Sequence, residues 1–200
     1  MRVYLIRHGE TDANQKGIYA GWSEAELTPK GMEQTDRIVD FLKEVGIDGV
    51  YASPSKRCMH VAMAFMGTVP VKALEELREQ NFGVFEGLMW HQAKRQYPME
   101  WERWCRDPEY RIPGGESFSE FYSRVIKGFE GIVAGGAQSV AVITHGGPIK
   151  AILSYIVCGD QGAFWRFKVD NGSVSMINIA GDGYAVIEKV NCTFAVGKWL

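Results

Sequence analysis

The chain has 200 residues, of which 46% are hydrophobic and 23% are charged, a composition typical of a single soluble globular domain over residues 1–200. Its formal net charge of −2 gives no excess of basic side chains, so neither nucleic acid nor a membrane surface is expected as a partner. No apolar run approaches the roughly 20 residues that cross a bilayer, and no signal peptide precedes the first predicted strand, so a cytoplasmic protein is expected.

The first predicted element is a strand over residues 3–6. This segment, Val-Tyr-Leu-Ile, is apolar or aromatic without alternation, which indicates a strand buried on both faces. Gly9 allows a sharp change of chain direction directly after it. We therefore expect Arg7 and His8 at the carboxyl end of a central strand, where open α/β sheets bind their ligands.

Helices and strands alternate along the rest of the chain. A polar loop over residues 11–27 leads to a helix that begins at Thr28 and ends at Gly46. Further helices are expected over 55–65, 117–133 and 148–157, with two short ones within 88–110 that are separated at Pro98; further strands are expected over 49–52, 69–73, 140–144, 164–169, 174–179 and 184–190. This order predicts an α/β fold: a three-layer α/β/α sandwich whose mostly parallel sheet has an antiparallel edge.

A second buried strand, over residues 139–144, also ends in a His-Gly pair, at His145 and Gly146. Neighbouring strands of one sheet lie about 4.8 Å apart. If the two strands are parallel neighbours, His8 and His145 can face the same small chemical group.

The segment Arg7-His8-Gly9-Glu10-Thr11, followed by Asn14, resembles the signature of the histidine phosphatase superfamily, which has the phosphoglycerate mutase-like fold. The resemblance continues in order through most of the chain, at residues 27–31, 53–57, 79–87, 114–117 and 145–147. The chain is most similar to the small bacterial phosphatases of this family, a branch that includes α-ribazole-5′-phosphate phosphatase and broad-specificity relatives.

The resemblance implies that His8 is a nucleophile that takes up a phosphoryl group. Histidine attacks phosphorus as a neutral ring, and a backbone carbonyl in the following loop is expected to fix its tautomer. Arg7 and Arg57 are expected to bind the phosphate, because a guanidinium offers paired donors and keeps its charge. Burying the charge of Arg7 at the end of a strand would cost free energy unless an anion paired with it.

His145 is expected to donate a hydrogen bond to the phosphoryl group, with the amide of Gly146 at a helix N-terminus beside it. The residues alone do not select the general acid, since the candidates are Glu75, Glu76, Glu79 and Glu86. The family pattern Leu-x-Glu-x-x-x-Gly matches at Glu79 and selects it. Asn14 is assigned to phosphate binding, and Thr11 and Gly21 to the border of the substrate.

These assignments predict a phosphomonoesterase that acts through phosphohistidine on small phosphorylated metabolites, with α-ribazole 5′-phosphate as one candidate. No cofactor and no metal is expected, because no Cys-x-x-Cys pair, phosphate-binding loop or other ligand motif occurs. The four cysteines are expected to be reduced. A phosphoglycerate mutase and a non-catalytic binder of phosphorylated ligands remain alternatives, a homo-oligomer is left open, and the aromatic segment 88–110 is either a lid or ordinary packing.

Overall fold

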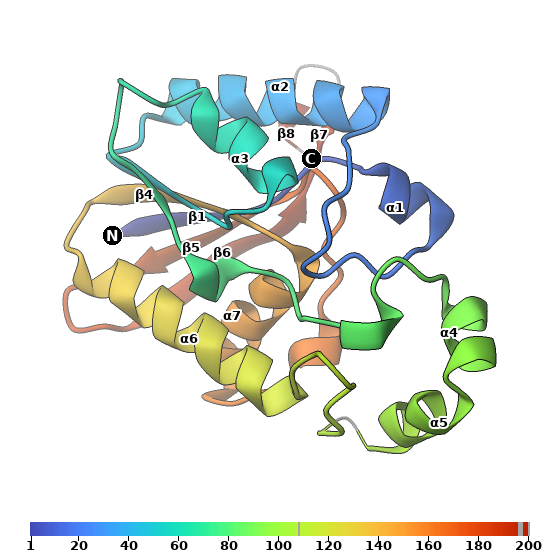
Figure 1. Cartoon of the computed structure of the whole chain (residues 1–200). Helices are drawn as coiled ribbons and strands as arrows, with labels where there is room; N and C mark the ends of the chain where they lie inside the picture. The colour runs from blue at the N-terminus through green and yellow to red at the C-terminus, as the bar shows by residue number, and fades with distance from the viewer. Residues whose placement is uncertain (108, 196–197, 200) are drawn as a thin grey trace.

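The fold is a six-stranded sheet between two layers of helices, seen edge-on in Figure 1. The computed structural model describes residues 1–107, 109–195, 198 and 199. The strands of this sheet are β1 (Arg2–Arg7), β2 (Gly49–Ala52), β3 (Val71–Ala73), β4 (Ser139–Thr144), β5 (Val174–Ile179) and β6 (Ala185–Cys192). Their order is β3-β2-β4-β1-β5-β6; the first four are parallel and the last two antiparallel, which confirms the predicted fold class.

The helices are α1 (Asp12–Lys16), α2 (Pro29–Val45), α3 (Lys56–Met63), α4 (Trp90–Gln96), α5 (Pro98–Arg106), α6 (Phe118–Ala134) and α7 (Gly146–Cys158). Helices α2 and α3 cover one face of the sheet and α6 and α7 the other, whereas α4 and α5 lie together beside the sandwich (Figure 1). Short 3-10 helices occur at η1 (Glu75–Leu77), η2 (Gly83–Phe85) and η3 (Phe164–Arg166), and a small ladder joins β7 (Phe194–Ala195) to β8 (Lys198–Trp199).

Strand β1 is the centre of the core, as its continuous apolar sequence predicts. Val3 and Leu5 pack into the cluster under α6 and α7, and Tyr4 and Ile6 pack into the cluster under α2 and α3. Successive side chains of a strand point to opposite faces, so both faces of β1 are buried. Its neighbour β4 is parallel and in register, which brings the two His-Gly turns to the same edge of the sheet.

Two close backbone approaches fix the chain directly after β1. A Cβ atom at Gly9 would lie 2.2 Å from the carbonyl oxygen of Gly31, and a Cβ atom at Gly31 would lie 2.0 Å from that of Glu10. Thr28 caps α2, as predicted, and its hydroxyl accepts the N–H of Gly31. The first turn of α2 therefore supports the segment that carries His8.

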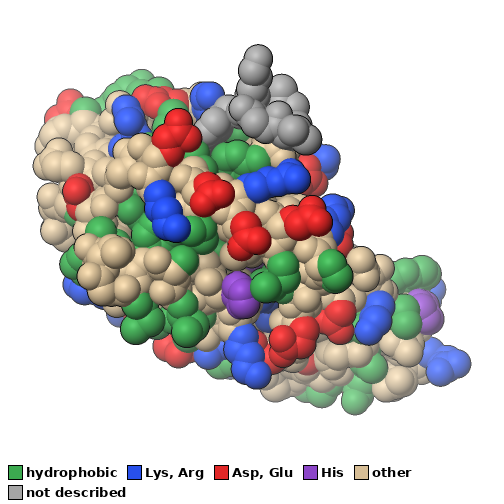
Figure 2. Space-filling view, turned by 90° about the horizontal axis from the view of Figure 1, so that it is seen from above, with side chains coloured by type: hydrophobic (Ala, Val, Ile, Leu, Met, Phe, Trp, Pro, Cys, Tyr) green, Lys and Arg blue, Asp and Glu red, His purple; other side chains and the backbone are tan. Residues whose placement is uncertain are grey.

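The outward side of α2 carries no single-sign patch. Figure 2 looks onto this side and shows acidic and basic side chains next to one another. The exposed charged residues of the helix are Lys30, Glu33, Asp36, Arg37, Asp40, Lys43 and Glu44. Mixed charges of this kind produce only a weak local field.

Two sequence-based predictions were wrong. Residues 164–169 form η3 and irregular chain instead of a strand, because Phe164 packs edge-to-face on Phe118 at 4.8 Å and both edges of β5 are already paired. The polar loop over 11–27 contains α1, which is too short for hydrophobic periodicity and depends on a capping box at its first residues. The other predicted helices and strands are present with small shifts at their ends.

The aromatic segment after Gly87 forms the two short helices that were expected, with Pro98 at the start of the second. The rings of Trp101 and Trp104 each lie 5.8 Å from that of Phe85, centroid to centroid. Phe85 is completely buried. These contacts are those of a small separate core, so packing accounts for most of this segment, and lid motion stays a prediction.

Candidate active site

His8 lies at the carboxyl end of β1 and is 4% exposed. Its Nδ1 atom is 2.7 Å from the carbonyl oxygen of Gly9. A carbonyl can only accept, so Nδ1 carries the ring proton and Nε2 keeps a free lone pair. Burial, then the charges of Arg57 and Arg7, hold the pKa of His8 well below its usual value. The ring is therefore neutral near pH 7, in the tautomer that a nucleophile requires.

Arg7 points along the same edge with part of its guanidinium unsatisfied. Its Nη1 donates to the carbonyl of Val169 at 2.7 Å, whereas its Nε is buried and has no partner among the described residues. A Cβ atom at Gly146 would lie 3.5 Å from the Arg7 Cζ, so the guanidinium packs on the first turn of α7. A buried N–H without an acceptor costs about 1–3 kcal/mol, and an anion at this position would remove that cost.

Arg57, in the first turn of α3, is buried and holds a loop as well as facing the site. Its Nε donates to Nδ1 of His145 at 3.3 Å, and its Nη1 donates to the carbonyl of Ser23 at 2.9 Å. Its Nη2 donates to the carbonyls of Ala20 and Gly21 at 3.0 and 2.7 Å. These four bonds leave one of the five guanidinium N–H groups. Arg57 thus offers an anion its charge and one donor.

His145 follows β4 and faces His8, with the ring centroids 5.1 Å apart. Because an arginine cannot accept, the bond from Arg57 places the remaining proton of His145 on Nε2, which lies 2.8 Å from the hydroxyl of Ser53. Burial, then Arg57, His8 and Arg7, hold the pKa of His145 well below its usual value. The structure therefore brings together two neutral histidines and two fixed cations.

Glu79 is held at the edge of this group by two backbone amides. Its Oε1 accepts the N–H of Gln80 and its Oε2 accepts that of Gly147, both at 2.9 Å. A Cβ atom at Gly147 would lie 2.0 Å from Oε1, so only glycine allows this approach. The charge of Glu79 also opposes the lowering of the Arg7 pKa by burial, which shows that the two groups interact.

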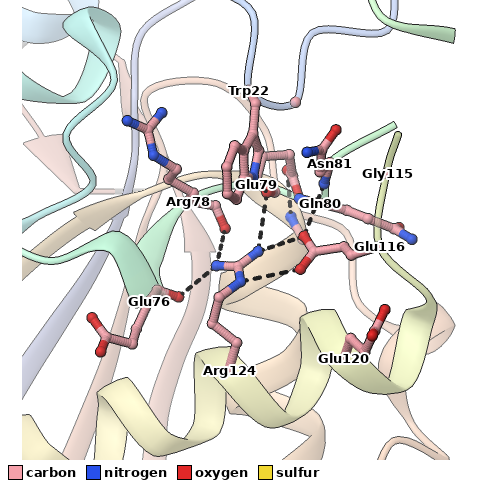
Figure 3. Close-up of polar contacts among 12 residues, drawn as sticks. Trp22, Glu76, Arg78, Glu79, Gln80, Asn81, Gly115, Glu116, Glu120 and Arg124 are labelled. Carbon is pink, nitrogen blue, oxygen red and sulfur yellow. Dashed lines mark hydrogen bonds and ion pairs between the residues drawn. The ribbon is translucent and has the colours of Figure 1, made fainter. Parts of the chain in front are cut away.

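An ion pair fixes the segment that carries Glu79 (Figure 3). Arg124 of α6 donates 2.6 Å from Nη2 to Oε1 of Glu116, and the two side chains are only 19% and 12% exposed. The same guanidinium donates to four backbone carbonyls of one segment, those of Glu75, Glu76, Arg78 and Glu79. Glu116 in turn accepts the N–H of Asn81 at 2.9 Å. One half-buried ion pair therefore supports the backbone on both sides of Glu79.

Glu86 organises the loop that surrounds Arg57, a role that the sequence did not reveal. Its carboxylate accepts from five donors, which are the N–H groups of Gly21, Trp22, Ser23 and Phe82 and the hydroxyl of Ser23. Four of these donors belong to residues 21–23, whose backbone also provides two of the carbonyls that bind Arg57. The sequence places Glu86 among four candidate acids and within the segment 79–87 that resembles the family, but it does not indicate which groups Glu86 binds.

Three further predicted site residues lie around this group in supporting positions. The hydroxyl of Thr11 caps α1 and donates to the Oδ1 of Asn14 at 2.9 Å. Asn171 links Asn14 to the backbone of His8, with its Nδ2 at 3.0 Å from the Asn14 Oδ1 and 3.4 Å from the His8 carbonyl. Gly21 is buried beneath Arg57, and a Cβ atom there would lie 1.9 Å from the carbonyl oxygen of Gln80. Asn14 thus borders the His8 segment, whereas Thr11 and Gly21 act through their neighbours.

A cavity of about 530 Å³ adjoins Glu79. Its lining residues are Tyr19, Glu79, Gln80, Phe82, Trp104, Cys105, Phe118, Phe121, Gly147, Lys150, Phe164 and Trp165. Most of them are aromatic, so the cavity is suited to an apolar, flat group. Neither histidine and neither arginine of the site lines it.

Some features are absent from the part of the chain that the structure describes. No group of three or more His, Cys, Asp or Glu side chains is arranged to hold a metal ion. No helix within the described ranges combines the length and the apolar character needed to cross a membrane. All four cysteines are free, with Cys58 buried next to His145.

The geometry is that of a phosphohistidine enzyme, and a family model agrees with it. The model for the histidine phosphatase superfamily (branch 1) matches residues 3–193. The chain therefore belongs to the histidine phosphatase superfamily, as the motifs predicted.

Curated relatives and solved structures resemble the chain over almost its whole length. The adenosylcobalamin/α-ribazole phosphatase of Escherichia coli is 33% identical in an alignment 199 positions long, which covers 96% of this chain and 96% of its own. Phosphoserine phosphatase 1 of Hydrogenobacter thermophilus is 30% identical and covers 100% of this chain and 96% of its own. The crystal structure of the α-ribazole phosphatase from Shigella flexneri superposes with a TM-score of 0.89 at 30% identity, over 99% of this chain and 100% of that one.

Proposed function

We propose that this protein is a phosphomonoesterase that transfers the phosphoryl group of a small phosphorylated metabolite first to His8 and then to water. The observation that carries the proposal is the state of His8. Its Nδ1 donates to the Gly9 carbonyl, its Nε2 is free, and burial together with the charges of Arg57 and Arg7 lowers its pKa. This combination gives a neutral nucleophile beside positive charge that attracts a phosphate.

In the first step, Nε2 of His8 attacks phosphorus and the bond from phosphorus to the ester oxygen breaks. Glu79, as a carboxylic acid, gives its proton to the leaving oxygen. In the second step, Glu79 removes a proton from water, the water oxygen attacks phosphorus, and the phosphorus–nitrogen bond breaks. The products are an alcohol and inorganic phosphate, and His8 and Glu79 return to their starting states.

Fixed positive charge supports the transferring group. Arg7 offers its unpartnered Nε, Arg57 its remaining N–H, and Asn14 and the amide of Gly146 further donors. His145 contributes Nε2–H, which must exchange the hydroxyl of Ser53 for a phosphoryl oxygen, because it has one proton to donate. Together these groups stabilise the charge that spreads over the equatorial oxygens.

The cavity next to Glu79 is the proposed place of the leaving group. Its aromatic lining favours a flat body, and its position lets Glu79 reach the ester oxygen. α-Ribazole 5′-phosphate is a candidate substrate, because its leaving group carries an aromatic base and the E. coli relative has the name of an α-ribazole phosphatase. Phosphoserine is a second candidate, from the name of the H. thermophilus relative.

The test is a panel of phosphate monoesters followed by release of inorganic phosphate, with and without prior dialysis against a chelator. Activity is expected to survive the dialysis. One arm contains 3-phosphoglycerate with trace 2,3-bisphosphoglycerate and is followed by phosphorus NMR. Rapid formation of 2-phosphoglycerate with little free phosphate would identify a mutase and contradict the proposal, and binding of the esters without turnover would identify a non-catalytic binder.

The free cysteines agree with a reducing compartment, and we propose a cytoplasmic location on that basis. Cys58 shows why reduction matters to the site. Its sulfur lies 3.6 Å from Nε2 of His145, and burial raises its pKa to about 12, so it stays a neutral thiol in contact with the ring.

A further inference from the structure

The cavity beside Glu79 contains one positively charged side chain, that of Lys150. Lys150 lies on α7, one turn after Gly147, so both residues face the cavity. Its ammonium is 5.5 Å from the ring centroid of Trp165 and 5.8 Å from that of Phe164. Aromatic faces attract a cation, but they give it no hydrogen-bond acceptor.

Lys150 has no ionic partner within the described residues, since it takes part in none of their salt bridges. Glu79 is the acid that interacts with it, yet both Glu79 oxygens already accept backbone N–H groups, from Gln80 and Gly147. Burial lowers the pKa of Lys150 and the charge of Glu79 opposes this. Within the described part of the chain, the cavity therefore holds a partly buried ammonium that forms no ion pair with a carboxylate.

On the basis of the phosphatase activity proposed above, we propose that Lys150 selects monoesters whose leaving group joins a flat apolar body to an anionic group such as a carboxylate. The aromatic lining receives the flat body, and the ammonium pairs with the anion. The phosphoryl group itself is not the partner of Lys150, because His8, Arg7 and Arg57 lie outside this cavity lining. The enzyme is therefore expected to have a higher kcat/KM for esters with an anionic leaving group than for esters with a neutral one such as α-ribazole.

The test uses two esters of nearly equal shape, 3-carboxyphenyl phosphate and 3-carbamoylphenyl phosphate, which differ by one charge in the leaving group. The wild-type enzyme is expected to show a kcat/KM about tenfold higher for the carboxylate ester, the size of one charge-assisted hydrogen bond. This preference should fall as salt is added, because screening weakens the pair. Lys150→Met should reduce the ratio to about one, and Lys150→Arg should keep most of it.

The matched control is Lys127→Met, which removes an exposed lysine of α6 that does not line the cavity and should leave the ratio unchanged. Equal kcat/KM values for the two esters in the wild type, or a ratio that persists in Lys150→Met, would overturn the selection by Lys150. Failure of the wild type to hydrolyse either ester would instead contradict the phosphatase activity on which the inference rests. Circular dichroism establishes that each variant is folded.

Discussion

The backbone N–H of Gly147 donates to Oε2 of Glu79 at 2.9 Å, and this contact joins the start of α7 to the segment that carries the proposed acid. It also uses a helix N-terminal amide that would otherwise be free to bind phosphate. The second histidine turn thus has two tasks: it presents His145 to the phosphoryl group and it positions Glu79.

Gly147→Ala is expected to displace Glu79, because the new methyl group would lie 2.0 Å from Oε1. The rate should fall most for alkyl phosphates, whose leaving oxygen needs a proton, and least for p-nitrophenyl phosphate. Glu79→Gln should show the same dependence on the leaving group. The control is Gly131→Ala on α6, where a Cβ atom meets nothing within 4 Å. A uniform loss over all leaving groups in Gly147→Ala would show that the contact serves only the fold.

Arg124→Lys is expected to impair catalysis through Glu79. A lysine cannot reproduce a guanidinium that donates to Glu116 and to the carbonyls around Glu79 at the same time. We expect kcat for an alkyl phosphate to fall about tenfold while the inhibition constant for vanadate changes little, since the phosphate ligands are untouched. Arg106→Lys, on the surface of α5, is the control. Equal losses of kcat and vanadate binding would point to general disruption of the site instead.

Replacement of Arg7 and replacement of Arg57 are both expected to weaken vanadate binding, but to affect the stability of the fold differently. Arg7→Ala removes the Nε donor, which has no partner among the described residues, and one bond to the Val169 carbonyl, so vanadate affinity should fall by roughly 1.5–3 kcal/mol with a smaller loss of unfolding free energy than in Arg57→Ala. Arg57→Ala should weaken vanadate binding and also destabilise the fold by about 1–3 kcal/mol or more, because it leaves the carbonyls of Ala20, Gly21 and Ser23 without their donor. Vanadate inhibition and denaturant unfolding separate the two effects, and unchanged inhibition in either variant would remove that arginine from the site.

The lowered pKa values of His8 and His145 predict acid sensitivity of the fold. Below about pH 6.5 the unfolded chain binds protons on these rings that the folded chain does not bind. The contribution of these rings to the free energy of unfolding is therefore fully present above that pH. It decreases as the pH falls, by up to about 1.4 kcal/mol per pH unit for each ring. Unfolding midpoints measured from pH 7.5 to 5 should show this slope, and His8→Asn should reduce it, whereas replacement of the exposed His60 by Gln should not.

The sequence predicted the parts of the site that lie on single strands. A continuous apolar run specifies β1, and the His-Gly turn follows it within two residues, so the positions of Arg7 and His8 needed no long-range information. The repeat of the same pattern brings the two histidines together only if β1 and β4 are parallel neighbours, and the structure pairs these strands. The family resemblance then supplied Glu79 and Arg57, whose positions depend on loops.

The sequence could not predict the supporting groups of the site, because their contacts join distant segments. Glu86 binds Gly21, 65 positions before it, and Arg124 binds a carbonyl 45 positions before it. Neither contact can be inferred from the neighbouring sequence. The strand expected over 164–169 failed for a similar reason. The aromatic residues of this segment are explained by packing on α6 and α7, and tertiary contacts override local propensity.

His8 is proposed to carry the phosphoryl group, and trapping this phosphohistidine tests the proposal directly. The wild-type enzyme is mixed with a phosphate monoester and quenched within the first turnovers, and the peptide that contains His8 is examined by mass spectrometry. We predict a phosphate on that peptide that is stable in base and lost in acid, and its absence together with loss of turnover in folded His8→Ala. Normal turnover by His8→Ala, or a phosphate bound to a different residue, would contradict the proposed mechanism.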